Sequence, residues 1–182
     1  GQVHAKEGYI IYANQNIPDY TGTRYKDTLE DMFHVPVAVE NDVNAAALGE
    51  AIYGAGRDYE QFLMLTYGTG VGGAVIENKE VFHGSSYSAS EFGAIITHSD
   101  VRLGGNDFFD GCYEKYASTT GLVRMMKEYR PELDTGRKIF DHLTDHTVMQ
   151  IIDRWVDEIM FGLSTLTHIY NPPCIILGGG IM

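Results

Sequence analysis

The alternation of apolar and polar positions predicts short strands and one short helix at the start of the chain. A strand is expected at 10–12, and turn-forming residues follow it at Asn16, Pro18, Asp19 and Gly22. The next apolar residues recur at helical spacing, which predicts a short helix through Tyr25, Leu29, Met32 and Phe33. The run VPVAV at 35–39 then predicts a short buried strand.

This strand leads into an alanine-rich stretch with the pattern of a helix start. Asn41 or Asp42 is expected to cap the helix, and Gly54 or Gly56 to end it. The predicted strand therefore delivers Asn41 and Asp42 to a helix N-terminus.

Two buried strands are expected on either side of a glycine-rich loop. They lie at 62–66 and 74–76, and a tight turn at Asn78 and Lys79 continues them as an antiparallel meander. A further strand is expected at 94–97, inside a segment rich in loops.

Helices dominate the remainder of the chain. The pattern becomes helical at Phe108, and short helices are expected within 121–129 and 137–143. One wide apolar stripe predicts a long core helix through Val148, Ile151, Ile152, Trp155, Val156, Ile159, Leu163 and Leu166. It stops at Asn171 and two prolines, and a last strand at 174–177 runs into three glycines. Strands followed by helices predict a mixed α/β domain.

Composition favours a folded protein that does not bind polyanions. Of the 182 residues, 44% are hydrophobic and 21% charged, close to globular averages. The 13 Lys and Arg against 25 Asp and Glu give a net charge of −12. Such a surface disfavours nucleic acid and anionic membranes as partners.

The two cysteines and the chain ends predict a cytoplasmic location. Cys112 and Cys174 lie far apart and form no CxxC pair, which favours a reducing compartment. No run of about 20 apolar residues predicts a membrane span, and residues 1–20 lack the pattern of a signal peptide. Because the chain opens without Met and stops just after a glycine run, we expect it to be an excerpt of a longer protein.

The loop Gly68-Thr69-Gly70-Val71-Gly72-Gly73 matches GxGxxG in spacing alone. A dinucleotide fingerprint requires a helix after the loop, whereas a strand follows here. Glycines at a hairpin turn can be purely structural, yet four of them in six positions, with a threonine among them, exceed what a tight turn needs. A loop that presents backbone N–H groups to phosphate is the favoured interpretation.

The other polar candidates each have an ordinary structural explanation. Asn41 and Asp42 are favoured helix caps, and Glu91 and Glu114 beside loops are typical solvated carboxylates. The seven histidines show neither HxH nor HExxH spacing, which argues against a metal site. Residue patterns alone thus lead to an α/β domain that handles phosphate.

Several strings, in order along almost the whole chain, resemble the ROK family of repressors, open reading frames and sugar kinases. They are VPVAVENDVNAAALGEAIYGAG, LMLTYGTGVGGAVIENKEVFHG, SEFGAIITH, GCYEKYAS and PPCIILGGG. The resemblance implies the actin-like, hexokinase-type (ribonuclease H-like) α/β fold. It also implies transfer of the γ-phosphoryl group of ATP, with Mg²⁺, to a hydroxyl of a hexose in a cleft between two domains.

The resemblance assigns roles to residues that match the family motifs. Asp42 would be the general base for the sugar hydroxyl and Asn41 a sugar ligand, as would Glu91 and Glu114. The phosphate loop would be Gly68, Thr69 and Gly70, and the adenosine-side glycines Gly178 and Gly179.

The zinc motif of the family is incomplete in this chain. Ala94 stands where the family has a histidine, and Gly105 and Asp107 replace two cysteines, which leaves Cys112. Structural zinc is therefore not expected, because Gly and Ala supply no ligand. His98 is a candidate substitute for the missing imidazole near the sugar.

The first phosphate loop of the family, DxGGT, does not occur before Asn41. We therefore expect 1–41 to be the end of a small N-terminal domain and 42–182 most of the large C-terminal domain, without its final helices. The segment alone is expected to lack ATP-dependent activity.

Three function classes remain open, of which the simplest is a scaffold that has lost its chemistry, as Ala94 and the missing zinc ligands would suggest. The first is a sugar kinase for glucose or a related aldohexose, such as N-acetylmannosamine or a β-glucoside. The second is the sugar-sensing domain of a ROK transcriptional repressor with DNA-binding helices upstream. Asp42, the intact loop and the final glycines favour the kinase. By analogy with the family, a homodimer is expected.

Overall fold

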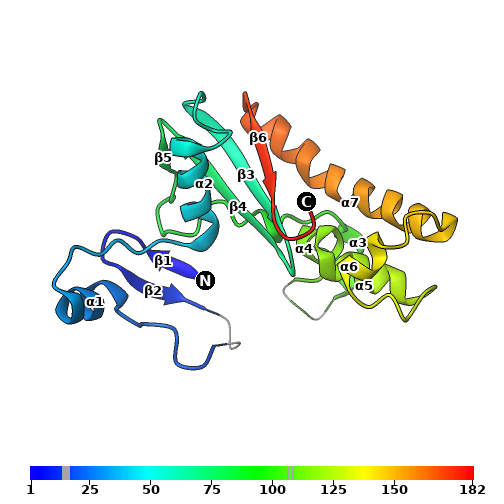
Figure 1. Cartoon of the computed structure of the whole chain (residues 1–182), viewed down its shortest axis with the longest axis horizontal. Coiled ribbons are helices and arrows are strands. Elements are labelled where there is room, and N and C mark those ends of the chain that lie inside the picture. Colours follow the sequence, from blue (N-terminus) through cyan, green and yellow to red (C-terminus); the bar gives the residue numbers. More distant parts are fainter. Residues whose placement is uncertain (14–16, 106, 108) are drawn as a thin grey trace.

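The computed structural model describes residues 1–13, 17–105, 107 and 109–182. The predicted turn residue Asn16 and the predicted helix start at Phe108 lie outside the described residues. Figure 1 shows a small N-terminal part, a central sheet and a helical part that contains one long helix.

The N-terminal part consists of a hairpin and one helix. Strands β1 (Gln2–His4) and β2 (Tyr9–Tyr12) pair antiparallel, and Val3 and Ile10 are buried. Helix α1 (Tyr25–Phe33) has the predicted bounds, but it contains no buried residue, and its Met32 and Phe33 side chains are exposed.

The central sheet carries the glycine loop at one end. Its strand order is β5-β4-β3-β6, from β3 (Gln61–Tyr67), β4 (Val71–Glu77), β5 (Glu80–Val81) and β6 (Ile175–Gly178). Tyr67 pairs with Val71 across the β3–β4 hairpin, so residues 68–70 form the connection. Strand β6 runs parallel to β3, so its glycines end at the same edge of the sheet.

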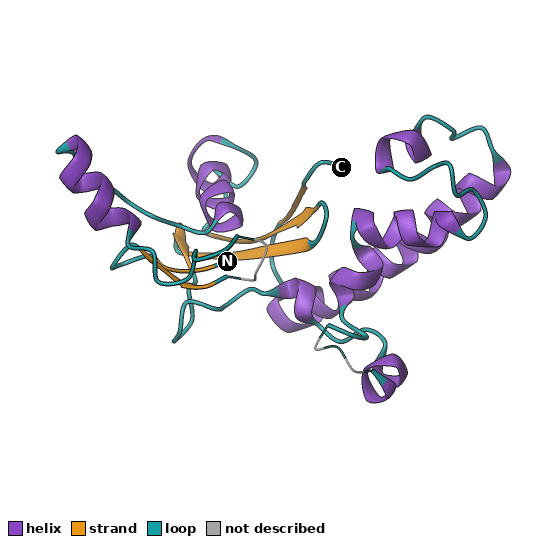
Figure 2. Ribbon diagram, turned by 90° about the horizontal axis from the view of Figure 1, so that it is seen from below, coloured by secondary structure: helices purple, strands orange, loops and turns teal. Residues whose placement is uncertain are grey.

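Both faces of the sheet are covered, and alternate residues of β3 and β4 separate two cores. One face packs against helix α2 (Asp42–Tyr53), as Figure 2 shows; this cluster contains Ala47, Ala51, Phe62, Met64, Ala74 and Ile76. The other face contributes Leu63, Leu65, Tyr67 and Val75 to the larger cluster. Continuous apolar strands are the expected result of burial on both sides.

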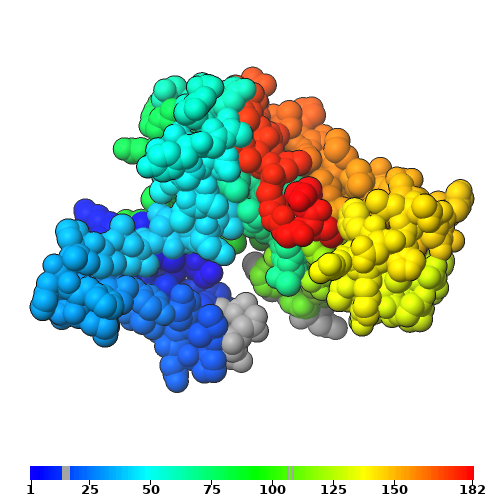
Figure 3. All heavy atoms as spheres, in the orientation of Figure 1, coloured from blue at the N-terminus to red at the C-terminus, as the bar shows by residue number. Residues whose placement is uncertain are grey.

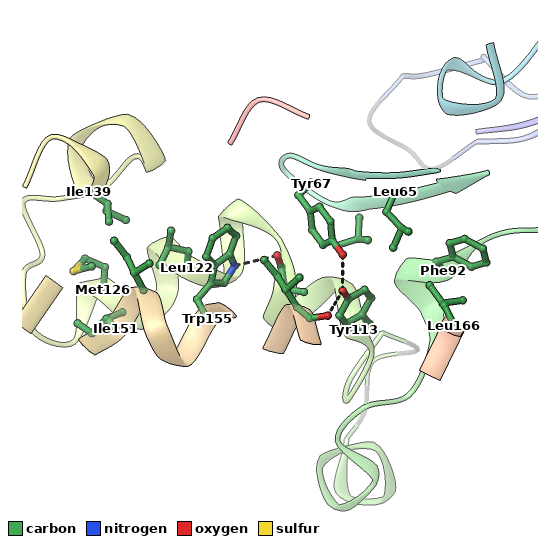
Figure 4. Packing of buried hydrophobic residues seen from close by; sticks show 14 of the residues in the cluster. Leu65, Tyr67, Phe92, Tyr113, Leu122, Met126, Ile139, Ile151, Trp155 and Leu166 are labelled. Atoms are coloured by element: carbon green, nitrogen blue, oxygen red, sulfur yellow. Dashed lines mark hydrogen bonds between the residues drawn. The ribbon is translucent and has the colours of Figure 1, made fainter. Parts of the chain in front are cut away.

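The helical part packs on the second face. It comprises the 3₁₀ turn η1 (Phe92–Ala94) and the helices α3 (Ser99–Gly104), α4 (Tyr113–Ala117), α5 (Thr119–Lys127), α6 (Gly136–Phe140) and α7 (His146–Tyr170). Helix α7 begins at an Asp145 cap, whose carboxylate accepts from Thr147 N at 2.8 Å, and ends at Asn171 in the left-handed region. Trp155 of α7 donates its indole N–H to the Ala117 carbonyl at 3.0 Å (Figure 4).

Two predicted strands are absent from the described chain. The VPVAV segment is irregular and largely exposed and forms no ladder, because Pro36 has no N–H and the Val37 N–H donates to Glu30 Oε1 at 3.0 Å. At 94–97 only a single bridge between Ile96 and Cys112 forms. There the N–H groups of Thr97 and His98 both donate to one carbonyl, that of Gly111, so no regular ladder develops.

The predicted helix from Phe108 onward begins later, with α4 at Tyr113. The β3, β4 and β6 strands, helix α2 and helix α7 confirm the predictions to within a few residues. Within the described ranges, no helix combines the length and apolar character needed to cross a bilayer.

Two glycines give a matched test of this packing. A Cβ at Gly162 of α7 would overlap the ring of buried Tyr113, whereas a Cβ at Gly49 of α2 would meet nothing within 4 Å. We expect Gly162→Ala to lower the free energy of unfolding by about 1–3 kcal/mol through overpacking. Gly49→Ala should raise it by about 0.5–1 kcal/mol through helix propensity. Urea unfolding measures both, and equal effects would contradict the packing.

Candidate functional site

A cavity of about 750 Å³ lies between the N-terminal hairpin, the start of α2, the glycine loop and α4. In the space-filling view, the blue N-terminal part and the green part of the chain face each other across a notch (Figure 3). The lining includes eight of the nine residues that the sequence predicted for the site: Asn41, Asp42, Gly68, Thr69, Gly70, Glu91, Glu114 and Gly179. These residues are thus adjacent in space although more than a hundred positions separate the first from the last.

Asn41 caps helix α2, as its position in the sequence predicts. Its backbone is extended, and Oδ1 accepts hydrogen bonds from Val43 N at 2.9 Å and Asn44 N at 3.2 Å. The amide Nδ2 donates to the Gly1 carbonyl at 3.2 Å. An amide nitrogen carries two hydrogens, so its second N–H can donate to a ligand in the cavity.

Asp42 is the first residue of α2, and it is exposed to the cavity. One carboxylate oxygen accepts from Val43 N at 3.0 Å. The helix N-terminus favours negative charge at this position. The carboxylate therefore has one oxygen held by the backbone and one that can reach a ligand.

The loop at 68–70 is held by helix α5 from one side. Thr119 N donates to the Gly68 carbonyl at 2.8 Å, and the Thr120 hydroxyl donates to the Thr69 carbonyl at 2.7 Å. These bonds hold the carbonyls of Gly68 and Thr69 against the start of α5. Space around the Gly68 α-carbon is open, since a Cβ there would meet nothing within 4 Å.

Glu114 connects α4 to the same loop. Its Oε2 accepts from Val71 N at 3.0 Å, and a Cβ at Gly70 would overlap this oxygen. A side chain at position 70 would therefore displace the carboxylate of Glu114 from its present position. The other oxygen of Glu114 remains for a ligand in the cavity.

Glu91 precedes η1 and is exposed in the cavity. Burial by the surrounding protein atoms raises the pKa of its carboxyl group; the N-terminal ammonium of Gly1 opposes this shift, and the charges of Glu114 and Asp42 add to it. Three carboxylates thus surround one cavity.

Glu40 and His83 support the site and were missed by sequence reasoning. Glu40 Oε1 accepts from Asn41 N at 2.8 Å and from Asn44 Nδ2 at 3.1 Å, and Oε2 lies 2.6 Å from His83 Nε2. The signal that could have found Glu40 is its position immediately before Asn41. Nothing in the sequence pattern pairs it with His83, which lies 43 positions away.

A second cavity of about 530 Å³ adjoins the loop on its other side. It shares Gly68 and Thr69 with the first cavity and is otherwise lined by Thr119, Gly136, Arg137, Phe140, Gly180, Ile181 and Met182. Of the two predicted adenosine-side glycines, Gly179 lines the first cavity and Gly178 lines neither. Gly178 is the last residue of β6, where it pairs with Thr66.

Two ion pairs hold the segment that corresponds to the incomplete zinc motif. Lys115 Nζ lies 2.8 Å from Asp107 and 2.7 Å from Asp110. The described residues contain no group of three or more His, Cys, Asp or Glu side chains arranged to hold a metal ion.

His98 does not line the cavity. Its ring stacks on Tyr116 at 3.7 Å between centroids, and Nε2 faces Glu158 Oε1 of α7 at 3.4 Å. Burial raises the pKa of the Glu158 carboxyl group. The structure therefore places His98 in a contact with α7 and not in the cavity as a substitute for the missing imidazole.

The pKa of Glu91 predicts a pH-dependent gain in stability for Glu91→Gln. Because the folded-state pKa is raised, the folded protein loses stability as pH rises from about 4.3, the ordinary unfolded value, through the folded pKa. We expect Glu91→Gln to have a higher Tm than the wild type at pH 7 and an equal Tm at pH 4. Glu80→Gln, at an exposed position of β5, is the control, and its Tm should not gain on that of the wild type between pH 4 and pH 7. A wild type that is more stable than Glu91→Gln at pH 7 would contradict the assigned direction.

Comparison with known proteins gives the family of this chain. The model of the ROK family matches residues 1–182. A glucokinase of Halalkalibacterium halodurans is 34% identical over 198 residues, which cover 100% of this chain and 59% of the relative. A beta-glucoside kinase of Listeria monocytogenes is 35% identical over 189 residues, which cover 100% of this chain and 62% of the relative.

A solved structure shows the same fold. A ROK family glucokinase from Streptomyces griseus, in complex with glucose and AMPPNP, matches with a TM-score of 0.83 and 32% identity. The match covers 100% of this chain and 63% of that one, so the described fold is a part of the actin-like fold of ROK sugar kinases. The chain spans about 60% of the length of the relatives it matches. It belongs to the ROK family.

Proposed function

We propose that the full-length protein transfers the γ-phosphoryl group of ATP to a hydroxyl of a hexose bound in the first cavity. The observation that carries this proposal is that one cavity contains a helix-start aspartate, two further carboxylates and a glycine loop. Phosphoryl transfer depends mainly on positioning and on charge stabilisation, and this set of groups suits both tasks.

The sugar would be held by groups that match a polyol. Glu91 and the outer oxygen of Glu114 accept hydrogen bonds from hydroxyls, and the second N–H of Asn41 donates one. Asp42 would accept the proton of the attacking hydroxyl. Its second oxygen is suited to this role because the first is occupied by Val43 N.

The nucleotide would lie across the glycine loop. The loop adds no negative charge, and backbone N–H groups and the Thr69 hydroxyl can donate to phosphate oxygens. The second cavity, with Phe140 and Ile181 in its lining, offers an apolar surface for a base. Arg137 has the one cationic side chain among the described residues that line the two cavities.

The described residues suit the binding of ATP better than the binding of Mg²⁺. The open space above Gly68 and the adjoining apolar cavity can take a nucleotide. Mg²⁺, which neutralises phosphate charge when ATP is bound, finds no cluster of protein ligands among the described residues. This part of the chain does not by itself account for how the ion is held.

The relatives support an aldohexose as substrate. They include a glucokinase and a beta-glucoside kinase, so glucose and β-glucosides are the first compounds to test.

Asp42→Asn provides the test of the catalytic assignment. In a coupled assay of ADP release with ATP, Mg²⁺ and a panel of hexoses, the full-length variant should lose about 10²–10⁴-fold in kcat. The loss is expected because an amide cannot accept the hydroxyl proton. Asp31→Asn, an exposed position on α1, is the matched control and should retain wild-type turnover.

The same assay separates the kinase from the sensor. Equal turnover by Asp42→Asn and the wild type would overturn the assignment of Asp42. If the wild type turns over no sugar but binds one in calorimetry, the proposal fails and a sugar-sensing domain replaces it.

The polypeptide 1–182 expressed alone is expected to show no sugar phosphorylation. The family's first phosphate loop, DxGGT, is not among these residues, so phosphate contacts would be incomplete. The measurement compares ADP release by this polypeptide and by the full-length protein at equal concentration. Comparable rates would show that the 182 residues suffice.

A further inference from the structure

Two buried tyrosines each stand one position before a residue of the proposed site. Tyr67 ends β3 immediately before Gly68, and Tyr113 begins α4 immediately before Glu114. Both are completely buried in the larger core cluster. Neither touches the first cavity, so neither has a direct role in the proposed chemistry.

The two hydroxyl groups form an ordered chain of hydrogen bonds. Tyr113 donates to the Ile159 carbonyl of α7 at 2.7 Å, and its oxygen lies 2.7 Å from that of Tyr67. Because Tyr113 has one hydroxyl hydrogen, Tyr67 is the donor of the second bond. Figure 4 shows the two rings meeting below the β3–β4 hairpin, edge to face, with centroids 6.3 Å apart.

The tyrosines remain neutral donors across the physiological pH range. Burial raises the pKa of Tyr67 to about 12, and it raises the pKa of Tyr113 as well. Ionisation therefore does not break this chain of hydrogen bonds in the physiological pH range.

A second link lies on the cavity side of the same elements. Glu114 Oε2 accepts from Val71 N at 3.0 Å. Tyr67 and Val71 are the two residues that flank loop 68–70, and they pair with each other in the hairpin. Consecutive residues of α4 thus hold both residues that flank the loop. Tyr113 bonds to Tyr67 inside the core, and Glu114 bonds to Val71 on the side of the cavity.

The two links leave little room for α4 and loop 68–70 to move independently. The Tyr113 ring fits against Gly162 of α7 with no room for a Cβ, and the Glu114 carboxylate lies against Gly70. A shift of α4 therefore displaces the loop, and a shift of the loop displaces Glu114. Burial alone explains why both tyrosine hydroxyl groups have hydrogen-bond partners. It does not explain why Glu114, which follows Tyr113, also bonds to Val71, the strand partner of Tyr67.

We propose that Tyr67 and Tyr113 are positioning residues that couple sugar binding at Glu114 to nucleotide binding at loop 68–70. The inference rests on the proposed function of the site. A sugar that fixes Glu114 also fixes helix α4, which holds one flank of the loop through the Tyr113–Tyr67 bond and the other through Glu114 itself, so each ligand strengthens the binding of the other by the same factor.

Calorimetry on the full-length protein tests the coupling. The dissociation constant of a non-hydrolysable ATP analogue is measured without sugar and with saturating sugar, and the ratio of the two is the coupling factor. In the wild type we expect a factor of at least about 5. In Tyr113→Phe, which removes the hydrogen bonds from α4 to Tyr67 and Ile159 but leaves the Glu114–Val71 bond, the factor should fall clearly below the wild-type value.

Tyr67→Phe is the milder variant, because Tyr113 keeps its bond to Ile159. It should lower the coupling factor less than Tyr113→Phe does. The double variant should match Tyr113→Phe, since both substitutions break the same link. Ile76→Ala, a destabilising change in the α2 cluster on the other face of the sheet, should keep the wild-type factor.

The outcomes separate this inference from the proposed function. A wild-type coupling factor of 1, or an unchanged factor in both tyrosine variants, overturns the inference while sugar and nucleotide still bind. A loss of coupling in Ile76→Ala as large as in Tyr113→Phe reduces the tyrosines to a role in stability, which also overturns it. Absence of any sugar or nucleotide binding to the wild type contradicts the proposed function itself.

Discussion

The site depends on the burial of both faces of strand β3. Because side chains alternate along a strand, its last two residues point to opposite sides of the sheet. Thr66 lies on the side of α2, where a Cβ at Gly72 would meet both Thr66 and Val43 beside Asp42. Tyr67 points into the larger core, where it meets Tyr113 beside Glu114. One strand end therefore sets the position of the proposed base and of a proposed sugar ligand at the same time.

The sequence predicted the elements whose pattern is long or strongly apolar. Helix α7 has an uninterrupted stripe and a clear stop, and strands β3 and β4 are buried on both faces. Short apolar runs were less reliable. The VPVAV run has the pattern of a strand, but a strand also needs a neighbouring strand that accepts its backbone hydrogen bonds. Here the Val37 N–H donates to a side chain of α1 instead. Local pattern carries no information about which backbone groups find partners elsewhere.

Eight of the nine predicted residues line one cavity, but the contacts that hold them there were not predictable. Residue types and spacing gave a capped helix and a phosphate-type loop, and the family resemblance added Glu91 and Glu114. The Glu40–His83 pair and the Tyr67–Tyr113 pair join positions 43 and 46 residues apart. Such pairs depend on tertiary geometry, and neither periodicity nor composition records it. The domain boundary at 41–42 and the roles of the site residues stay predictions.

The contact between Gly70 and Glu114 constrains how relatives of this chain can change. Position 70 belongs to the glycine loop, where an absent side chain would ordinarily be attributed to the approach of phosphate. Here the nearest obstacle to a Cβ is the carboxylate of Glu114, a group predicted to bind sugar. Substitutions at these two positions should therefore arise together during evolution: a larger residue at 70 becomes acceptable only once 114 has shortened or turned away. A change in sugar preference through position 114 would in this way reshape the loop that faces the nucleotide.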